Sequence, residues 1–310
     1  MMPDRSTARR AVVLLSALLA WPAAALQGQQ PWLNSPLGDG AQPVFPFFEG
    51  WYDNGDGTYT LSFGYMNRNP ETVVEIPLGE RNYLEPARFD GVQPSYFIPA
   101  RQRGVFAVTI TEEMRDDDVW WHLIAADGSD YKVPGRARAN AYQLDWNPRP
   151  HGSVAPLLWF TSESDAVHGP EGTWAPQTVS ARVGQPVTLS VNVRDPSERD
   201  TTDRRFREPV PVRVYWSKHQ GPEGEITFAR DPGMPDIPPP GAGRGGAQRA
   251  RPPEELRLPP TGGAARVQAT FAAPGEYVVR AQVDNWDTPD SSSGDQCCWT
   301  NGFIRVRVTP

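Results

Sequence analysis

Short segments in which apolar and polar residues alternate recur throughout the second half of the chain. Residues 187–193, for example, have the order Val-Thr-Leu-Ser-Val-Asn-Val. This period of two places every apolar side chain on one face of an extended strand. Similar alternation predicts further strands at residues 210–216, 267–271, 277–283 and 304–308. Because no segment has the 3.6-residue period of an amphipathic helix, the pattern predicts an all-β protein.

The first half begins with a predicted β-hairpin. Tyr59, Leu61, Phe63 and Tyr65 alternate with small or polar residues, as in a half-buried strand, and residues 53–57 (Asp-Asn-Gly-Asp-Gly) supply the turn. The turn sequence also resembles a calcium-binding loop, but a glycine stands where the second ligand is needed, so we favour the turn. Other strands are predicted at 72–76, 105–111, 119–124 and 141–146. Bulky residues on both faces of the 119–124 segment predict a strand that is covered on both sides.

Two segments lack this alternation. Residues 76–104 contain four prolines and little periodicity, which is unusual for a loop unless it is functional or locally structured. Residues 231–263 contain nine Pro and seven Gly among 33 residues. Such a composition buries too little apolar surface to offset the entropy of ordering the chain. We therefore predict that residues 231–263 form a disordered insertion between two strands, either without a specific role or binding a partner in polyproline II form.

Residues 1–25 have the order of a secretory signal peptide. Three arginines precede the apolar run 11–20, and the small residues Ala23, Ala24 and Ala25 follow it. The apolar run is shorter than the roughly 20 residues of a membrane-spanning helix, so we expect cleavage after Ala25 and no membrane span in the mature chain. An uncleaved N-terminal anchor is the alternative. The expected location is the periplasm or the extracellular space.

Charge restricts the class of partner, and length predicts the number of domains. The 310 residues include 30 Lys and Arg against 37 Asp and Glu. Removing residues 1–25 takes away three arginines and one aspartate, which leaves 27 basic and 36 acidic residues and a net charge of −9. A chain this acidic has no electrostatic footprint for nucleic acid or an anionic membrane. The length predicts two domains, which we place at 47–177 and 178–310 after a linker at 26–46.

The order of turn and strand residues near the C-terminus carries a resemblance. Residues 271–281 (Phe-Ala-Ala-Pro-Gly-Glu-Tyr-Val-Val-Arg-Ala) resemble the closing hairpin of bacterial PKD-like and immunoglobulin-like domains, over about residues 178–310. Residues 295–301 (Asp-Gln-Cys-Cys-Trp-Thr-Asn) are similar to the ending of uncharacterised exported bacterial proteins. The resemblance implies two β-sandwich-like domains, the second immunoglobulin-like or PKD-like with the insertion 231–263. It implies no catalytic residues.

Motifs for familiar chemistries are absent from the sequence. It contains no nucleophile elbow, phosphate-binding loop or dinucleotide fingerprint, and the four histidines are too widely spaced for a metal-ligand pair: His122, His151, His168 and His219. A carboxylate pair for glycoside hydrolysis depends on a distance in space that sequence spacing does not show. We therefore predict no catalytic residues, no metal ligands and no cofactor, with calcium as the alternative. Trp121 and Trp216 follow the strand alternation and are expected in the core.

The loop at residues 285–302 is the strongest candidate for a binding site. Its acidic and aromatic residues are of the types that hold calcium or stack on a ligand: Trp286, Asp287, Asp290, Asp295 and Trp299. A loop closure with a purely structural role is the alternative, and we favour it slightly.

This loop also contains both cysteines of the chain, Cys297 and Cys298. Adjacent Cα atoms lie about 3.8 Å apart, below the usual disulfide range of about 4.4–6.8 Å, so a bridge between them is a strained ring. An oxidising compartment favours this bridge. Two free thiols and bridges to a second molecule are the alternatives.

Together these features predict an exported, non-catalytic binding or structural protein of the cell envelope or exterior. The expected partner is a carbohydrate or another envelope protein. The alternative is a secreted hydrolase that acts on a polysaccharide or another extracellular polymer. An exposed aromatic strip or apolar patch would favour binding, whereas a cleft with two facing carboxylates or clustered histidines would favour hydrolysis.

Overall fold

The computed structural model describes residues 38–310 with five gaps, at 147–151, 205, 236, 239–251 and 286–298. The signal-peptide segment 1–25 and both cysteines lie outside the described residues, so cleavage and the disulfide stay predictions. Within the described part, regular structure consists of β-strands and a few single-turn 3₁₀ helices, which confirms the all-β prediction. No helix in this part is long and apolar enough to cross a membrane.

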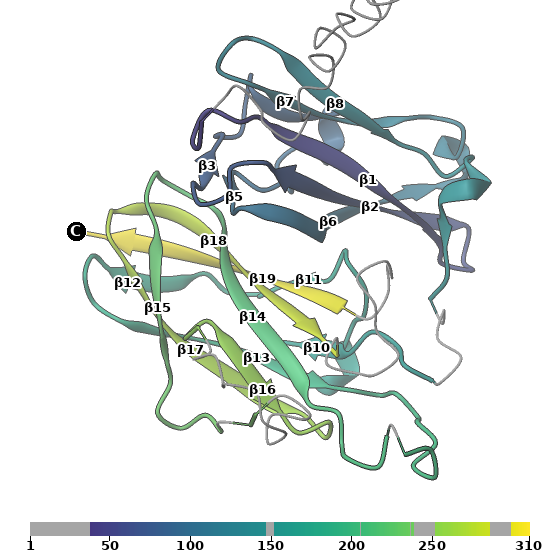
Figure 1. Cartoon of the computed structure of the whole chain (residues 1–310), viewed down its shortest axis with the longest axis vertical. Coiled ribbons are helices and arrows are strands. Elements are labelled where there is room, and N and C mark those ends of the chain that lie inside the picture. Colours follow the sequence, from purple (N-terminus) through teal and green to yellow (C-terminus); the bar gives the residue numbers. More distant parts are fainter. Residues whose placement is uncertain (1–37, 147–151, 205, 236, 239–251, 286–298) are drawn as a thin grey trace, which may run out of the picture. The chain divides into compact units, whose positions relative to one another are not determined.

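The second half of the chain forms a β-sandwich (Figure 1). One sheet has the strand order β10-β13-β17-β15, and the other has the order β11-β19-β18-β14-β16, with β12 also paired to β19. Their apolar faces enclose one core that includes Trp216, Phe271 and Val306. The strands are β10 (Leu157–Trp159), β11 (Thr173–Trp174), β12 (Val179–Arg182), β13 (Val187–Arg194), β14 (Val212–Gln220), β15 (Ile226–Arg230), β16 (Glu255–Leu258), β17 (Gly263–Phe271), β18 (Gly275–Asp284) and β19 (Trp299–Thr309).

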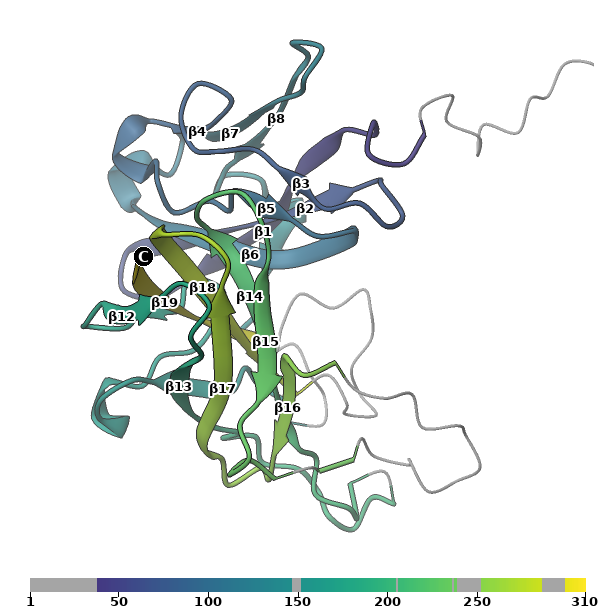
Figure 2. The ribbon, with the colours of Figure 1, turned by 90° about the vertical axis from the view of Figure 1, so that its left-hand side faces the viewer.

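Strand β16 corrects the prediction of a disordered insertion at residues 231–263. It pairs antiparallel with β14, and Leu256 and Leu258 are buried in the sandwich core. Arg257, between them, is also buried and forms an ion pair with Glu255. The prediction used the Pro and Gly content of the whole segment, and this overall composition does not reveal a four-residue strand that belongs to the core. Figure 2 shows β16 at the edge of the sheet that contains β14.

The first half of the chain packs a second core between smaller sheets. A four-stranded sheet has the order β6-β2-β1-β9, a three-stranded sheet has the order β4-β7-β8, and β3 pairs with β5. The shared core includes Leu61, Phe63, Phe106 and Trp121. The elements are β1 (Val44–Asp53), β2 (Thr58–Asn67), β3 (Val74–Glu75), β4 (Asn82–Glu85), η2 (Ala87–Phe89), β5 (Tyr96–Phe97), β6 (Ala100–Thr111), η3 (Glu112–Met114), β7 (Val119–Ile124), β8 (Asp130–Gly135), η4 (Asn140–Tyr142) and β9 (Gln143–Leu144); a further turn, η5 (Glu163–Asp165), follows β10.

The predicted hairpin is confirmed, but its second strand is more buried than the alternation indicates. Strands β1 and β2 pair in antiparallel register from Val44–Asn67 to Asp53–Tyr59. Thr60 and Ser62, which alternate with the apolar residues, are buried as well. The polar face of β2 is thus enclosed by protein, and a polar face is not by itself a sign of exposure.

Strand β7 is less completely buried than its sequence predicts. Its bounds agree with the predicted 119–124 segment, and Trp121 on one face is fully buried. On the other face Trp120 and Ile124 are only half-buried. His122, between them on the same face, is buried, so this face is covered in part.

The aperiodic residues 76–104 are ordered locally. The buried side chain of Asn82 donates from Nδ2 to the carbonyl oxygens of Ile76 (2.9 Å) and Pro94 (2.7 Å). Its Oδ1 accepts from Trp121 Nε1 at 3.1 Å. One side chain thereby supplies the partners that a regular sheet supplies elsewhere.

Side chains of the sandwich also bond to backbone carbonyls of the first half. Arg280 Nη1 donates to Val105 O at 3.1 Å, and Trp299 Nε1 donates to Gly104 O at 3.1 Å. Residues 39–310 accordingly group into one compact unit. The proposed domain boundary at 177/178 stays a prediction.

Candidate functional site

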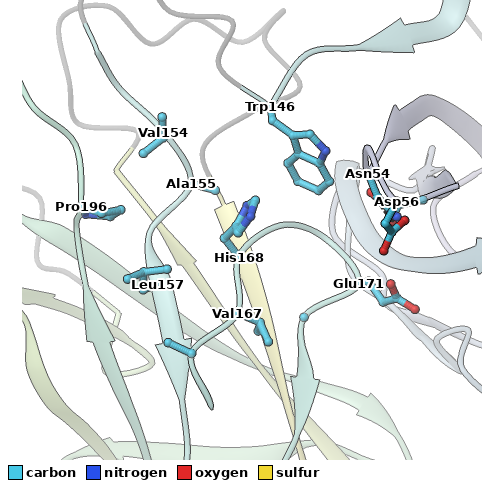
Figure 3. Close-up of a pocket in the computed structure, with 13 residues that line it drawn as sticks. Asn54, Asp56, Trp146, Val154, Ala155, Leu157, Val167, His168, Glu171 and Pro196 are labelled. Carbon is cyan, nitrogen blue, oxygen red and sulfur yellow. Dashed lines mark hydrogen bonds between the residues drawn. The ribbon is translucent and has the colours of Figure 1, made fainter. Parts of the chain in front are cut away.

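A groove of about 700 Å³ runs between the turn of the β1–β2 hairpin and residues 154–172 (Figure 3). One wall is polar and is formed by Asn54, Asp56, Thr60 and Glu171. The other wall is apolar and comes from two short segments and a proline: Val154, Ala155, Leu157, Ala166, Val167 and Pro196. In Figure 3, Trp146 lies between the two walls. The volume is within the range of small-molecule sites, about 300–1,000 Å³.

The hairpin turn fixes the carboxylate of Asp56. Its Oδ1 accepts hydrogen bonds from the Thr58 backbone N (3.0 Å) and from Thr58 Oγ1 (2.6 Å). These bonds, the side-chain one foremost, hold the pKa of Asp56 below its usual value. Asp56 is therefore an ionised hydrogen-bond acceptor at neutral pH.

A line of hydroxyl groups continues this wall. Asn54 Nδ2 donates to Thr58 Oγ1 (2.9 Å) and to Thr60 Oγ1 (3.1 Å), and the hydroxyl of Thr60 lies 3.1 Å from that of Thr109 on β6. Thr109 in turn hydrogen-bonds to Glu171 Oε2. The polar wall is thus a connected network whose spacing follows the β2–β6 register, in which Thr60 is paired with Thr109.

Trp146 is held rigidly at the groove. Its Nε1 donates to Asp53 O at 3.1 Å, and Tyr52 stacks on the indole with ring centroids 4.0 Å apart and planes 21° apart. A Cβ atom on Gly169 would lie 2.5 Å from Cζ3 of Trp146, so the ring packs directly on the backbone there. These three contacts fix the orientation of the indole without a ligand.

His168 completes the groove near Trp146. The two rings meet edge to face, with centroids 4.8 Å apart and planes 76° apart. His168 is exposed, and partial desolvation by its neighbours lowers its pKa, which favours the neutral imidazole at pH 7. The described residues that line the groove include the acids Asp56 and Glu171 and no Lys or Arg. The groove therefore favours neutral or cationic ligands over anions.

The structure places one of the sequence-predicted binding residues. Trp299 is 1% exposed, and its Nε1 is bonded to Gly104 O. Its ring is part of the packed interior, which corrects the prediction that Trp299 contacts a ligand. Trp286, Asp287, Asp290 and Asp295 lie outside the described residues, as do Cys297 and Cys298, so their predicted roles stay predictions. Within the described residues, no group of three or more His, Cys, Asp or Glu is arranged to hold a metal ion.

Sequence reasoning misses the groove itself. The sequence pattern assigns Asp56 to a turn and Trp146 to a predicted strand at 141–146, of which only Gln143–Leu144 is observed. It places His168 in a loop without a metal-ligand partner. These residues come together only through the fold, and no local pattern joins positions 54–60 to 146 and 154–172.

A second cluster surrounds His122 on the three-stranded sheet. Its Nδ1 lies 3.0 Å from Asp130 Oδ2, its Nε2 lies 3.4 Å from Glu85 Oε2, and Tyr83 stacks on the ring with planes 7° apart. Glu85, His122 and Asp130 belong to the neighbouring strands β4, β7 and β8, respectively. The contacts of the cluster tie these three strands together.

Comparisons with known proteins add little to this geometry. No family model matches the chain, and no curated protein is similar to it. Among solved structures, the D0-D1 domain of Intimin is 11% identical over 86% of this chain and 97% of that chain, with a TM-score of 0.23. The D00-D0 domain of Intimin is 12% identical over 86% and 100%, with a TM-score of 0.25, and a titin A168169 structure is 12% identical over 86% and 99%, with a TM-score of 0.19. Likenesses at these scores carry no argument, so the following conclusions rest on this chain's own residues.

Proposed function

We propose that this chain is an exported, non-catalytic binding protein of the cell envelope or exterior, and that the groove is its binding site. The observation that carries the proposal is the rigid Trp146 between a hydrogen-bonding wall and an apolar wall. Apolar surface with a few fixed polar groups is the usual composition of a ligand site. Export is supported by the signal-peptide order of residues 1–25.

Hydrolysis is the second candidate, because Asp56 and Glu171 both line the groove. A glycosidase needs one carboxylic acid that stays protonated, and burial commonly raises the pKa of that group. Asp56 is exposed, and its pKa is lowered by Thr58 instead. Glu171 is also exposed, and one of its oxygens bonds to Thr109. The surroundings of these two acids therefore favour ligand binding.

A thermal-shift screen tests the binding role. The purified chain is mixed separately with neutral oligosaccharides, amines, phosphates and fatty acids, and a ligand that binds the folded state raises Tm. We expect at least one class to raise Tm for the wild type and not for Trp146→Ala. Trp120→Ala is the matched control, since Trp120 is a half-buried tryptophan on β7 that does not line the groove. If no class produces a shift that depends on Trp146, the groove is not a binding site.

A second assay separates binding from hydrolysis. The chain is incubated with the same oligosaccharides, and newly formed reducing ends are measured. We expect none above the rate of the buffer. Release of reducing ends that disappears in both Asp56→Asn and Glu171→Gln would replace the binding proposal with the hydrolase.

A further inference from the structure

The charges of the groove restrict the class of its ligand. Asp56 and Glu171 are acids, the pKa of His168 is lowered, which favours its neutral form, and none of the described residues that line the groove is Lys or Arg. Phosphates, nucleotides and carboxylates would meet repulsion without a compensating cation. The ligand is therefore neutral or cationic.

The arrangement of aromatic rings distinguishes a neutral ligand from a cationic one. Sites for ammonium groups commonly surround the cation with several aromatic faces. Here Trp146 is the one tryptophan among the described residues that line the groove, and one of its faces is covered by Tyr52, which is itself buried. Trp146 is half-buried, and the part of its ring that lines the groove beside hydrogen-bonding groups is instead suited to contact the C–H groups of a sugar, because an amphipathic aromatic presents apolar surface next to polar neighbours.

The hydrogen-bonding groups of the polar wall are mostly acceptors. Asn54 Nδ2 is already bonded to Thr58 and Thr60. Each carboxylate has one oxygen bonded to a threonine hydroxyl, at Oδ1 of Asp56 and Oε2 of Glu171, and among the described residues its second oxygen accepts no side-chain or backbone hydrogen bond from another residue. A ligand that fits this wall must bring donors, which sugar hydroxyls and amide N–H groups supply.

The opposite wall needs apolar atoms from the same ligand. Val154, Leu157 and Val167 are half-buried there, and a backbone bridge between Leu158 and Val167 joins their two segments. A sugar that carries only hydroxyl groups would place polar groups against these methyl groups, which is unfavourable. An acetamido substituent supplies both an N–H donor and a methyl group.

We propose that the groove binds an uncharged oligosaccharide that carries N-acetyl groups. A sugar ring lies against Trp146, its hydroxyls and amide N–H donate to Asp56 and Glu171, and its acetyl methyl groups contact the wall at Val154 and Leu157. This inference rests on the proposed binding function and adds the class of ligand to it.

Titration calorimetry with two matched probes tests the inference. The first probe is the β-1,4-linked tetramer of N-acetylglucosamine, and the second is the tetramer of glucose with the same linkage. We expect the acetylated probe to bind about tenfold more tightly, because its methyl groups bury apolar surface at the wall. Equal affinities, or preference for the glucose tetramer, would overturn the acetyl-specific part of the proposal.

Variants locate the binding. Trp146→Ala is expected to weaken the acetylated probe at least about tenfold, and Trp120→Ala to leave its affinity unchanged. Asp56→Asn is the second variant, and its amide Oδ1 can still accept the two hydrogen bonds from Thr58. Its control is Asp127→Asn, because Asp127 accepts from Ser129 N at 2.9 Å in a comparable turn outside the groove. Weakening by Asp56→Asn alone supports the site, whereas equal effects of both aspartate variants contradict it.

Two outcomes keep this inference separate from the binding function. If the acetylated tetramer fails to bind while an alkylammonium probe raises Tm through Trp146 and loses affinity with added salt, the ligand class is wrong and the binding function stands. If no probe class binds through Trp146, both fail. Affinity for the acetylated tetramer that does not change with salt is the result expected of an uncharged ligand.

Discussion

Residues 39–146 meet residues 152–310 at several places, and two of these places differ sharply. At the closed contact, Asn301 is fully buried, and its Nδ2 donates to Gly104 O (2.8 Å) and Pro170 O (2.7 Å). At the groove, the hydroxyl of Thr109 reaches an exposed Glu171. Strand β6 contributes to both places, near its middle at Gly104 and near its end at Thr109. The buried contact therefore fixes the strand whose end is hydrogen-bonded to the binding wall, and we expect perturbations to cost stability at one place and affinity at the other.

The largest loss of stability is expected from Gly104→Ala. Gly104 has φ +48, and a Cβ atom there would lie 2.0 Å from Cζ2 of the buried Trp299. The left-handed backbone costs about 1–2 kcal/mol and the overlap about 1–3 kcal/mol more, so the free energy of unfolding should fall by about 4 kcal/mol in urea titration. Gly128→Ala is the control, because Gly128 has φ +85 and a Cβ atom there would have nothing within 4 Å. Equal losses for the two variants would show that the Trp299 contact is not tight.

Lys218→Met is expected to cost about 3 kcal/mol, since buried groups that lose a charged donor are left unsatisfied. The Lys218 side chain is 1% exposed, and its Nζ bonds to Glu75 Oε2 (2.8 Å) and to the carbonyls of Pro222 and Gly224. Lys132→Met is the matched control, because Lys132 is exposed and lies 3.7 Å from Asp130. A loss as small as that of Lys132→Met would mean that water reaches the contact around Lys218.

Strands β7, β14 and β16 show which features of the fold the sequence predicts and which it does not. Alternation locates β7 at its observed bounds and places Trp121 and Trp216 in the core, because an apolar residue on a strand has few other places to go. It does not locate Lys218 in a buried contact, since a lysine at an alternating position of β14 also fits a solvated edge. It misses β16 for a similar reason: Arg257 and flanking prolines obscure the two leucines that the core requires.

The groove is beyond prediction for a different reason. Its chemistry is carried by residues of ordinary types, such as a turn aspartate and a loop histidine, whose roles depend on distances between segments about 100 positions apart in the sequence. The predicted site at residues 285–302 stands out because its unusual residues are adjacent in sequence. A cluster of unusual residues in the sequence can be recognised directly, whereas residues that come together only in the folded chain cannot.

Lowering the pH should reduce the stability of the folded chain through His219. The imidazole is fully buried with its Nε2 2.8 Å from Val92 O, and burial lowers its pKa from 6.5 to about 3. The unfolded state therefore takes up a proton near pH 6.5 while the folded state does not, so stability is complete above that pH and falls by about 1.4 kcal/mol per pH unit below it. Between pH 6.5 and pH 5 the loss is about 2 kcal/mol.

The contribution of His219 is isolated by comparison with His219→Gln. A glutamine amide still donates to the carbonyl but does not titrate, so the difference in unfolding free energy between the two proteins should depend on pH with the slope given above. Parallel pH curves for the two proteins would mean that His219 is protonated in the folded state as readily as in the unfolded chain.

The smallest effect on stability is expected from Thr109→Val, which keeps the shape of the side chain and removes its hydroxyl. That hydroxyl bonds to Glu171 and lies 3.1 Å from the hydroxyl of Thr60. A single hydrogen bond of this kind contributes about 1 kcal/mol, and water can replace it at the exposed Glu171, so the urea midpoint should move little. Affinity for the acetylated tetramer should nevertheless fall, by less than in Trp146→Ala, because Glu171 loses the bond that orients its carboxylate while the aromatic ring stays in place.

Thr270→Val is the control, since Thr270 is a half-buried threonine on β17 that does not line the groove. Unchanged affinity in Thr109→Val would remove Glu171 from the binding site and leave Trp146 and Asp56 to carry it; a large loss of stability would instead show that the end of β6 belongs to the closed contact.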